Sequence, residues 1–197
     1  MKLLKIVSLG LLATGLSFSS FAQNKHENWG RNNIKFYPLS TFTYGGVGFG
    51  VAYERIMDQK GLVGVQLPLH LGLSTDFSND YDATIMFNPG VKIYPWGQRK
   101  VTYALGTSIF FNSGNFTRSN WDYQTGLVTY SKSNRFSTGL LINQYLQFNI
   151  TENINLGFEF GAGPSYINRE KDKFTGQVFS DGIDGMVNFG FHFGYRF

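Results

Sequence analysis

From Val187 onward, the final stretch of the chain, "GMVNFGFHFGYRF", alternates without error between two kinds of residue. Every odd-numbered position from 187 to 197 is apolar or aromatic, and the positions between them are Asn, Gly, His or Arg. Successive side chains of a β-strand point to opposite faces, so a period of two predicts a strand with one apolar face. Such a face must be covered, either by a second layer of protein or by lipid.

The same alternation occurs in seven further segments, although it is less regular in the first of them, at 33–44. Between residues 63 and 74, for example, the odd positions from Val63 to Leu73 are all apolar, and the even positions are Gly, Gln, Pro, His or Ser. A high share of aromatic residues (17%) and 24 glycines fit a chain of many strands with small side chains on one face. The eight predicted strands are at 33–44, 45–57, 62–74, 84–94, 101–111, 139–150, 154–166 and 185–197.

The connections between these strands alternate in length. Short links follow the second, fourth and sixth strands, and the first connection, near Gly45, is also tight. Long polar links follow the third, fifth and seventh strands, at 75–82, 112–135 and 168–182. Short turns on one rim and long loops on the other are typical of transmembrane barrels.

A soluble barrel is the alternative, with the apolar rows pointing inward. An eight-stranded barrel has an interior just wide enough for side chains to fill, so the face of small residues fits inside and the bulky rows fit outside. Lipid offers the backbone no hydrogen-bond partners, so the sheet must close by pairing its first and last strands. The sequence therefore predicts an all-β fold, an eight-stranded antiparallel up-and-down transmembrane β-barrel.

The first 22 residues have the pattern of a secretory signal peptide. Lys2 and Lys5 precede an uncharged, Leu-rich stretch, and Ser20 and Ala22 supply the small residues of a cleavage site. We expect cleavage after Ala22, which leaves a barrel domain at 23–197 with a net charge of +2. This charge does not indicate nucleic-acid binding. The absence of cysteine excludes disulfides and thiolate metal sites.

The signal peptide, the eight alternating strands and the ending "FGYRF" resemble the small outer-membrane β-barrel proteins of the porin-like and OmpA-like class. The resemblance covers nearly all of residues 23–197. It implies residence in the cell outer membrane and contact with its lipid. It also implies that Phe193, Tyr195 and Phe197 form a sorting signal that the barrel-assembly machinery reads. The class is specific about fold and location and says little about activity.

Four charged residues occupy alternate strand positions on the same face as the small residues, in the half of the barrel nearer the short turns. They are Glu54, Lys92, Glu159 and Arg196. Two acids and two bases at similar depth in so narrow a barrel predict a luminal ion network that closes the lumen, because an unpaired buried charge is costly. The alternative is that each charge is hydrated separately. Near the same rim, a girdle of aromatic residues that includes Tyr94, Trp96 and Tyr103 is expected at the membrane interface.

The longest loop contains Trp121, Tyr123 and Tyr130 among polar residues. Aromatic residues in such a loop suit a recognition site for a surface ligand, although a hairpin that simply continues beyond the bilayer has the same composition. In the strands, Pro38, Pro68, Pro89 and Pro164 lack the donor that a closed sheet needs. Bulges, or strand ends above the membrane, are expected at these prolines.

Catalytic and metal-binding patterns are weak in this sequence. His70 and Ser74 are a possible Ser–His pair, but no carboxylate is positioned to orient the histidine, and the three histidines have no metal-ligand spacing. We therefore expect neither cofactor nor metal. The leading hypothesis is a barrel with a structural or surface-interaction role and no enzyme activity. A narrow porin is the alternative, and a lipid-modifying enzyme is third.

Overall fold

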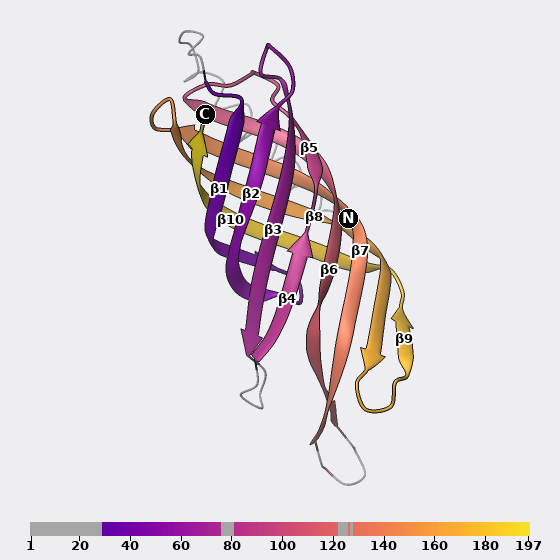
Figure 1. Ribbon diagram of the computed structural model, residues 1–197. Helices are drawn as coiled ribbons and strands as arrows, with labels where there is room; N and C mark the ends of the chain where they lie inside the picture. Colours follow the sequence, from indigo (N-terminus) through magenta and orange to yellow (C-terminus); the bar gives the residue numbers. More distant parts are fainter. Residues whose placement is uncertain (1–28, 76–80, 122–125, 127) are drawn as a thin grey trace, which may run out of the picture.

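The computed structural model describes residues 29–75, 81–121, 126 and 128–197, which form a closed all-β barrel (Figure 1). Antiparallel pairs join neighbours in the order β10-β1-β2-β3-β4-β6-β7-β8, and β8 pairs with β10 to close the ring. The strands are β1 (Asn32–Phe42), β2 (Gly46–Ile56), β3 (Val63–Thr75), β4 (Tyr81–Phe87), β5 (Gly90–Ile93), β6 (Val101–Trp121), β7 (Val128–Asn149), β8 (Ile154–Asp172), β9 (Val178–Asp181) and β10 (Asp184–Arg196).

The barrel wall has eight strands, because β4 and β5 are two parts of one barrel strand. Phe87 pairs with Leu69 of β3, and Gly90 pairs with Gln66, so the register is the same on both sides of the break. Pro89, which has no N–H, interrupts the ladder there without shifting it. The short β9 lies outside the wall and pairs with β8. The predicted eight-stranded antiparallel barrel is therefore confirmed.

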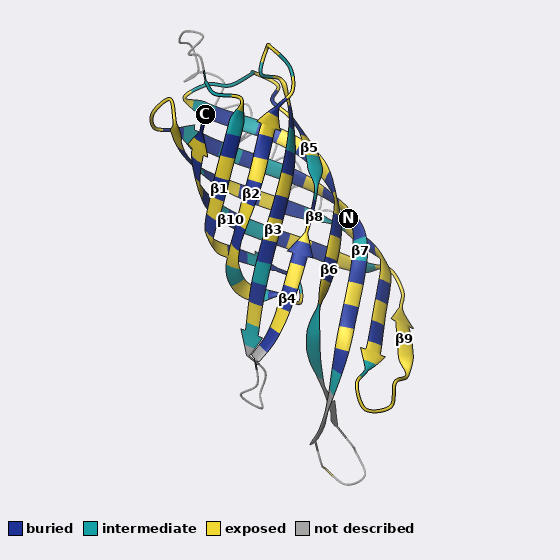
Figure 2. Ribbon diagram, viewed as in Figure 1, coloured by how far each residue is buried: buried dark blue, intermediate teal, exposed yellow. Residues whose placement is uncertain are grey.

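Side chains alternate between the lumen and the outer surface along each strand, as Figure 2 shows in bands of buried and exposed residues. The bulky apolar rows face outward, as predicted, and about half of each side chain remains exposed; examples are Ile34, Val51, Leu69, Ile109 and Ile142. Exposed apolar area of this extent is unfavourable in water, at about 25 cal/mol per Å². The outer surface therefore requires an apolar environment around it.

Pro38 lies at a β-bulge in β1. Phe36 and Leu39 are three residues apart, yet they pair with Phe193 and Phe191 of β10, which are two apart. The ladder with β2 shifts at the same place. The extra residue explains why the alternation in this segment of the sequence is irregular, because a bulge reverses which face each later residue occupies.

The remaining prolines have separate solutions. Pro164 lies beside a second bulge, where Ser165 and Ile167 pair with two consecutive residues of β7. Pro68 faces the lumen opposite the β4–β5 break, and its carbonyl accepts a hydrogen bond from the Asn88 N–H at 3.3 Å. Interruptions of the hydrogen-bond ladder and bulges thus let the closed sheet tolerate prolines, which have no backbone N–H to donate.

The two ends of the barrel differ. At the short-turn rim lie the links 57–62, 94–100 and 150–153, together with the start of β1 and the end of β10. At the long-loop rim lie the other connections. The described residues include no helix with the length and hydropathy needed for a membrane crossing. Trp96 and Tyr103 lie at the outer surface near the short-turn rim, but Tyr94 is 2% exposed and points into the lumen, so its assignment to an aromatic girdle is wrong.

An apolar layer fills the lumen on the side of the long-loop rim. It consists of five contacting side chains that are at most 4% exposed: Phe42, Met86, Phe110, Leu141 and Met186. Glycines in the wall leave room for luminal rings. A Cβ on Gly157, for example, would lie 2.4 Å from Cε1 of His192. The lumen is therefore packed with side chains.

A sheet extends from the long-loop rim. Strands β6, β7 and β8 contain 21, 22 and 19 residues, about twice the roughly 9–11 that cross a bilayer. Their outer portions stay paired, as far as Trp121 with Val128 and Ser133 with Asp172, and β9 adds a fourth strand. Figure 1 shows this rim sheet, formed by 115–121, 128–134, 166–172 and β9, projecting beyond the ends of β1 and β2.

Candidate functional site

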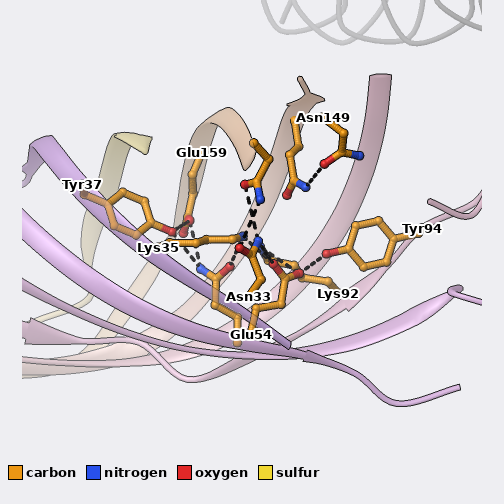
Figure 3. Close-up of polar contacts among 11 residues, drawn as sticks. Asn33, Lys35, Tyr37, Glu54, Lys92, Tyr94, Asn149 and Glu159 are labelled. Atoms are coloured by element: carbon orange, nitrogen blue, oxygen red, sulfur yellow. Dashed lines mark hydrogen bonds and ion pairs between the residues drawn. The ribbon is translucent and has the colours of Figure 1, made fainter. Parts of the chain in front are cut away.

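A buried ion cluster occupies the lumen nearer the short-turn rim (Figure 3). Glu54 from β2 lies at its centre and is 0% exposed. Its Oε2 is 2.5 Å from Nζ of Lys35 on β1, and its Oε1 is 3.5 Å from Nζ of Lys92 on β5. The hydroxyl of Tyr94 donates a hydrogen bond to Oε1, and Nδ2 of Asn33 donates to Oε2 at 3.5 Å. One carboxylate therefore holds two ammonium groups.

The cluster continues toward the apolar layer through uncharged groups. Lys35 donates to Oε1 of Gln66 at 3.1 Å, and Nε2 of Gln66 donates to Oε2 of Glu159 at 3.0 Å. The Tyr37 hydroxyl donates to the same oxygen of Glu159 at 2.9 Å. Glu159 thus joins the ion cluster through Gln66 and has no direct ion pair among the described residues.

The four charges predicted to share the lumen are all buried there, but they are not equivalent. Glu54 and Lys92 form an ion pair, and Glu159 is linked to them indirectly. Arg196 is 1% exposed, and none of its three guanidinium nitrogens has a hydrogen-bond partner within the described residues. The expected closed network of four is therefore incomplete at Arg196, because strand register places Glu54 beside Lys35 instead.

Sequence reasoning missed Lys35, Tyr37, Gln66 and Tyr94 as members of the cluster. Lys35 has a luminal position and lies near the short-turn end of β1, so the signal was present. The irregular alternation of that segment concealed it. Tyr94 was misplaced because aromatic residues near a rim usually face the interface.

The lumen also contains a serine–histidine contact that differs from the expected one. Oγ of Ser40, not of Ser74, lies 2.8 Å from Nδ1 of His70. Ser40 and His70 are each 1% exposed, and Nε2 of His70 has no described partner. No described carboxylate is hydrogen-bonded to His70 and both side chains are buried, so among the described residues this pair lacks the arrangement of a hydrolase. The described residues also contain no cluster of three acidic, His or Cys side chains that suits a metal.

A cleft of about 530 Å³ opens at the long-loop rim above the apolar layer. Arg135 stacks its guanidinium 3.5 Å from the ring centroid of Tyr44 and pairs with Asp184 at 3.3 Å. The Tyr44 hydroxyl donates to Asp184 at 2.5 Å. This bond lowers the pKa of Asp184 and raises the pKa of Tyr44 from their usual values. The other lining residues are Phe116, Thr117, Glu170, Asp181, Gly182 and Ile183.

Tyr44 has an unusual backbone conformation. Its φ is 64°, in the left-handed region that bulky residues rarely occupy. The tight connection between β1 and β2 requires this value, and the contacts with Arg135 and Asp184 offset the strain. The rim cleft is thus held in one geometry by an arginine, a tyrosine and an aspartate.

The other predicted site residues fall in different places. Trp121 and Tyr130 lie in the backbone ladder at the outer ends of β6 and β7, and Tyr123 lies outside the described residues. Phe193 and Tyr195 of β10 and the terminal Phe197 face outward and are about half exposed. Residues 1–22, the expected signal peptide, also lie outside the described part of the chain.

No family model matches this chain, and no curated protein matches its sequence. Solved structures do match its fold. A major outer membrane protein from Thermus thermophilus aligns with a TM-score of 0.54 and 15% identity, over 84% of this chain and 99% of the other. Ail, the attachment invasion locus protein of Yersinia pestis, aligns with a TM-score of 0.52 and 15% identity, over 86% of this chain and 99% of Ail.

The chain has the fold of the small outer-membrane β-barrels. At this level of identity the match concerns the fold alone. It agrees with the outward apolar rows and the closed ring of eight strands that the structure shows independently. In an outer-membrane barrel the outer surface faces lipid, and the two rims lie at the two water interfaces.

Proposed function

We propose that this protein resides in the cell outer membrane as a closed barrel whose role is surface interaction through the rim sheet and the rim cleft. The filled lumen carries the proposal. The apolar layer and the ion cluster lie one above the other, and both consist of side chains that are almost completely buried. An ion would have to cross contacting apolar side chains and then displace paired charges, so the barrel is poorly suited to conduct.

The rim sheet supports the second part of the proposal. The strands β6, β7 and β8 continue far past the length needed to cross the membrane, and the rim sheet and its adjoining loops carry apolar side chains outside the lipid-facing rows. Phe174 is 80% exposed, Ile183 is 75% exposed and Val178 is 61% exposed. These exposed apolar side chains on a projecting sheet support its use as a contact surface for another molecule.

Planar-bilayer recording of the purified barrel tests the closed lumen. We expect no steady conductance from the unmodified protein, and none after Phe174→Gln, which changes only the rim. A steady single-channel conductance in the unmodified protein would contradict the proposal and favour a narrow porin.

Binding tests the rim sheet. In the variant, residues 115–133 are replaced by an Asn-Gly turn so that β6 and β7 end near the rim. Cells carrying the native barrel or this variant are compared for binding to an array of secreted and extracellular proteins. We expect selective binding by the native barrel and its loss in the variant, with equal amounts of folded barrel in the membrane. Equal binding by both forms would exclude the rim sheet as the contact surface.

A further inference from the structure

We infer that the lumen binds one small inorganic anion, of about the size of chloride, at the guanidinium of Arg196. The site lies near the short-turn rim, at the opposite end of the barrel from the rim sheet, and it does not depend on the surface-interaction role. Two observations lead to it: the Arg196 side chain has no hydrogen-bond partner among the described residues, and the described charges in the lumen do not balance.

Arg196 is a buried cation that the described protein does not pair. The residue is 1% exposed, and Nε, Nη1 and Nη2 all lack a hydrogen-bond partner in the described residues. Its guanidinium faces the ring of Trp29, whose centroid is 5.9 Å from Cζ. A guanidinium has five N–H donors and always carries its charge, so leaving it buried without an acceptor is costly.

The nearest carboxylate has no capacity left for Arg196. Glu54 lies at the same level of the barrel, since both residues pair with Asn33 of β1. Its two oxygens already contact Lys35, Lys92, Tyr94 and Asn33. Two ammonium groups share this one carboxylate, so Glu54 is itself surrounded by an excess of positive charge.

The second luminal carboxylate is too far away. Glu159 pairs with Gly190 of β10, six residues before Arg196. Six residues of extended strand span about 20 Å, which exceeds the combined reach of the two side chains. Glu159 is instead held by Tyr37 and Gln66 near the apolar layer.

The charges in this half of the lumen do not balance. Between the apolar layer and the short-turn rim, the described buried residues include three cations, Lys35, Lys92 and Arg196, and two carboxylates, Glu54 and Glu159. Counted formally, with every Lys, Arg and Glu charged and each His uncharged, these residues carry one positive charge in excess. A single monovalent anion bound to the unpaired guanidinium removes the excess and gives its donors an acceptor.

Anomalous diffraction locates the anion. Crystals of the barrel grown in sodium bromide are expected to show a bromine peak within hydrogen-bond distance of the Arg196 guanidinium. The peak should be absent in Arg196→Gln, which keeps a polar side chain without the charge. Absence of a bromine peak at Arg196 in the native barrel would overturn the proposal.

Thermal unfolding in lipid measures the energetic effect. Native barrel is compared in sodium chloride and in sodium gluconate of equal ionic strength, because gluconate is much larger than chloride. At a chloride concentration ten times the dissociation constant, linkage predicts about an 11-fold increase in the folding equilibrium constant. Arg196→Gln should show no difference between the salts, whereas Lys60→Gln, an exposed lysine of the same rim, should behave as the native barrel.

Two outcomes would overturn the inference from this measurement. An equal response to chloride in the native barrel and in Arg196→Gln would assign the effect to general screening. A native barrel whose stability is the same in chloride and in gluconate would show that no anion stabilises the fold at Arg196.

Discussion

Oε2 of Glu54 lies 2.5 Å from Nζ of Lys35 in a lumen where both side chains are 1% exposed. Lys92 approaches the other oxygen of the same carboxylate. Removing Glu54 therefore leaves two buried cations unpaired, whereas removing Lys35 leaves the Glu54–Lys92 pair intact.

We expect Glu54→Gln to lower the free energy of unfolding in lipid by about 3–5 kcal/mol and Lys35→Met to lower it by clearly less. Urea titration of the folded barrel in lipid vesicles measures both values. Glu152→Gln, in an exposed short turn, is the control and should have little effect. Small losses for both Glu54→Gln and Lys35→Met would instead indicate that each charge is hydrated separately.

The apolar layer gives a second prediction from two adjacent phenylalanines. Phe110 is 0% exposed within the layer, and Phe111 faces outward at 43%. Phe110→Ala leaves a cavity that its neighbours cannot fill and should cost about 3–5 kcal/mol in the same titration. Phe111→Ala should cost less, because lipid chains can occupy the vacated space. A larger loss for Phe111→Ala than for Phe110→Ala would contradict a packed apolar layer inside the barrel.

The lipid-facing surface is tested by charge. Ile142 is 67% exposed on the barrel wall, and Ile183 is 75% exposed in the loop before β10. Ile142→Arg places a cation in the bilayer and should lower stability by about 2–4 kcal/mol if it lies near the midplane. Ile183→Arg should change stability little, although the two side chains are similarly exposed. Equal effects in lipid vesicles would contradict the assigned membrane position.

The rim cleft predicts a pH dependence. The hydrogen bond from Tyr44 lowers the pKa of Asp184 and raises the pKa of Tyr44. A lowered carboxyl pKa stabilises the fold above the usual value of about 4, and this contribution is lost as the pH falls through the lower folded value. A raised phenol pKa stabilises the fold below about 10 and is lost as the pH rises through the higher folded value.

Tyr44→Phe keeps the ring beneath Arg135 and removes this hydrogen bond. It should lower stability by about 1 kcal/mol or less, because the Asp184 side chain is 37% exposed. The difference in unfolding midpoint from the native barrel should be largest near neutral pH and should shrink as the pH falls below about 4. Tyr166→Phe, at an exposed tyrosine, serves as the control. A difference that persists at low pH would assign the effect to packing of the ring.

The outward aromatic row of β10 leads to a prediction about assembly. Phe197 and Phe174 are both exposed, the first at the end of the terminal row and the second in the loop at the long-loop rim. If the terminal aromatics are read during assembly, Phe197→Gln should reduce the yield of folded barrel in the outer membrane several-fold, and Phe174→Gln should not. Quantification of the heat-modifiable folded form in membrane fractions measures both. Equal yields would exclude a sorting role for Phe197.

The sequence by itself determined the architecture of the barrel. Period-two alternation specifies which face of each strand is apolar, and a one-residue error would move every later side chain to the other face, so the outward position of residues such as Ile109 and Phe193 follows from the pattern. The alternation of short and long links then orders the strands into a meander. The same pattern predicted that four charged side chains point into the lumen: Glu54, Lys92, Glu159 and Arg196.

Tertiary structure decided which luminal groups meet. The alternation along a strand predicts that a side chain points inward. The stagger and tilt of the strands set how far along the barrel axis that side chain lies and which partners it meets across the lumen. Glu54 meets Lys35 and Lys92, while Arg196 on the same level has no hydrogen-bond partner among the described residues. Likewise, Ser40 meets His70 because the bulge at Pro38 shifts its register by one residue.

The rim cleft also depended on tertiary structure. Tyr44, Arg135 and Asp184 come from three separate places in the sequence, and no local pattern links them. Closure of the barrel brings the β1–β2 turn beside the start of β10, since β1 pairs with β10. A pattern of period two reports only the direction of each side chain, whereas contacts between distant strands depend on how the whole sheet closes.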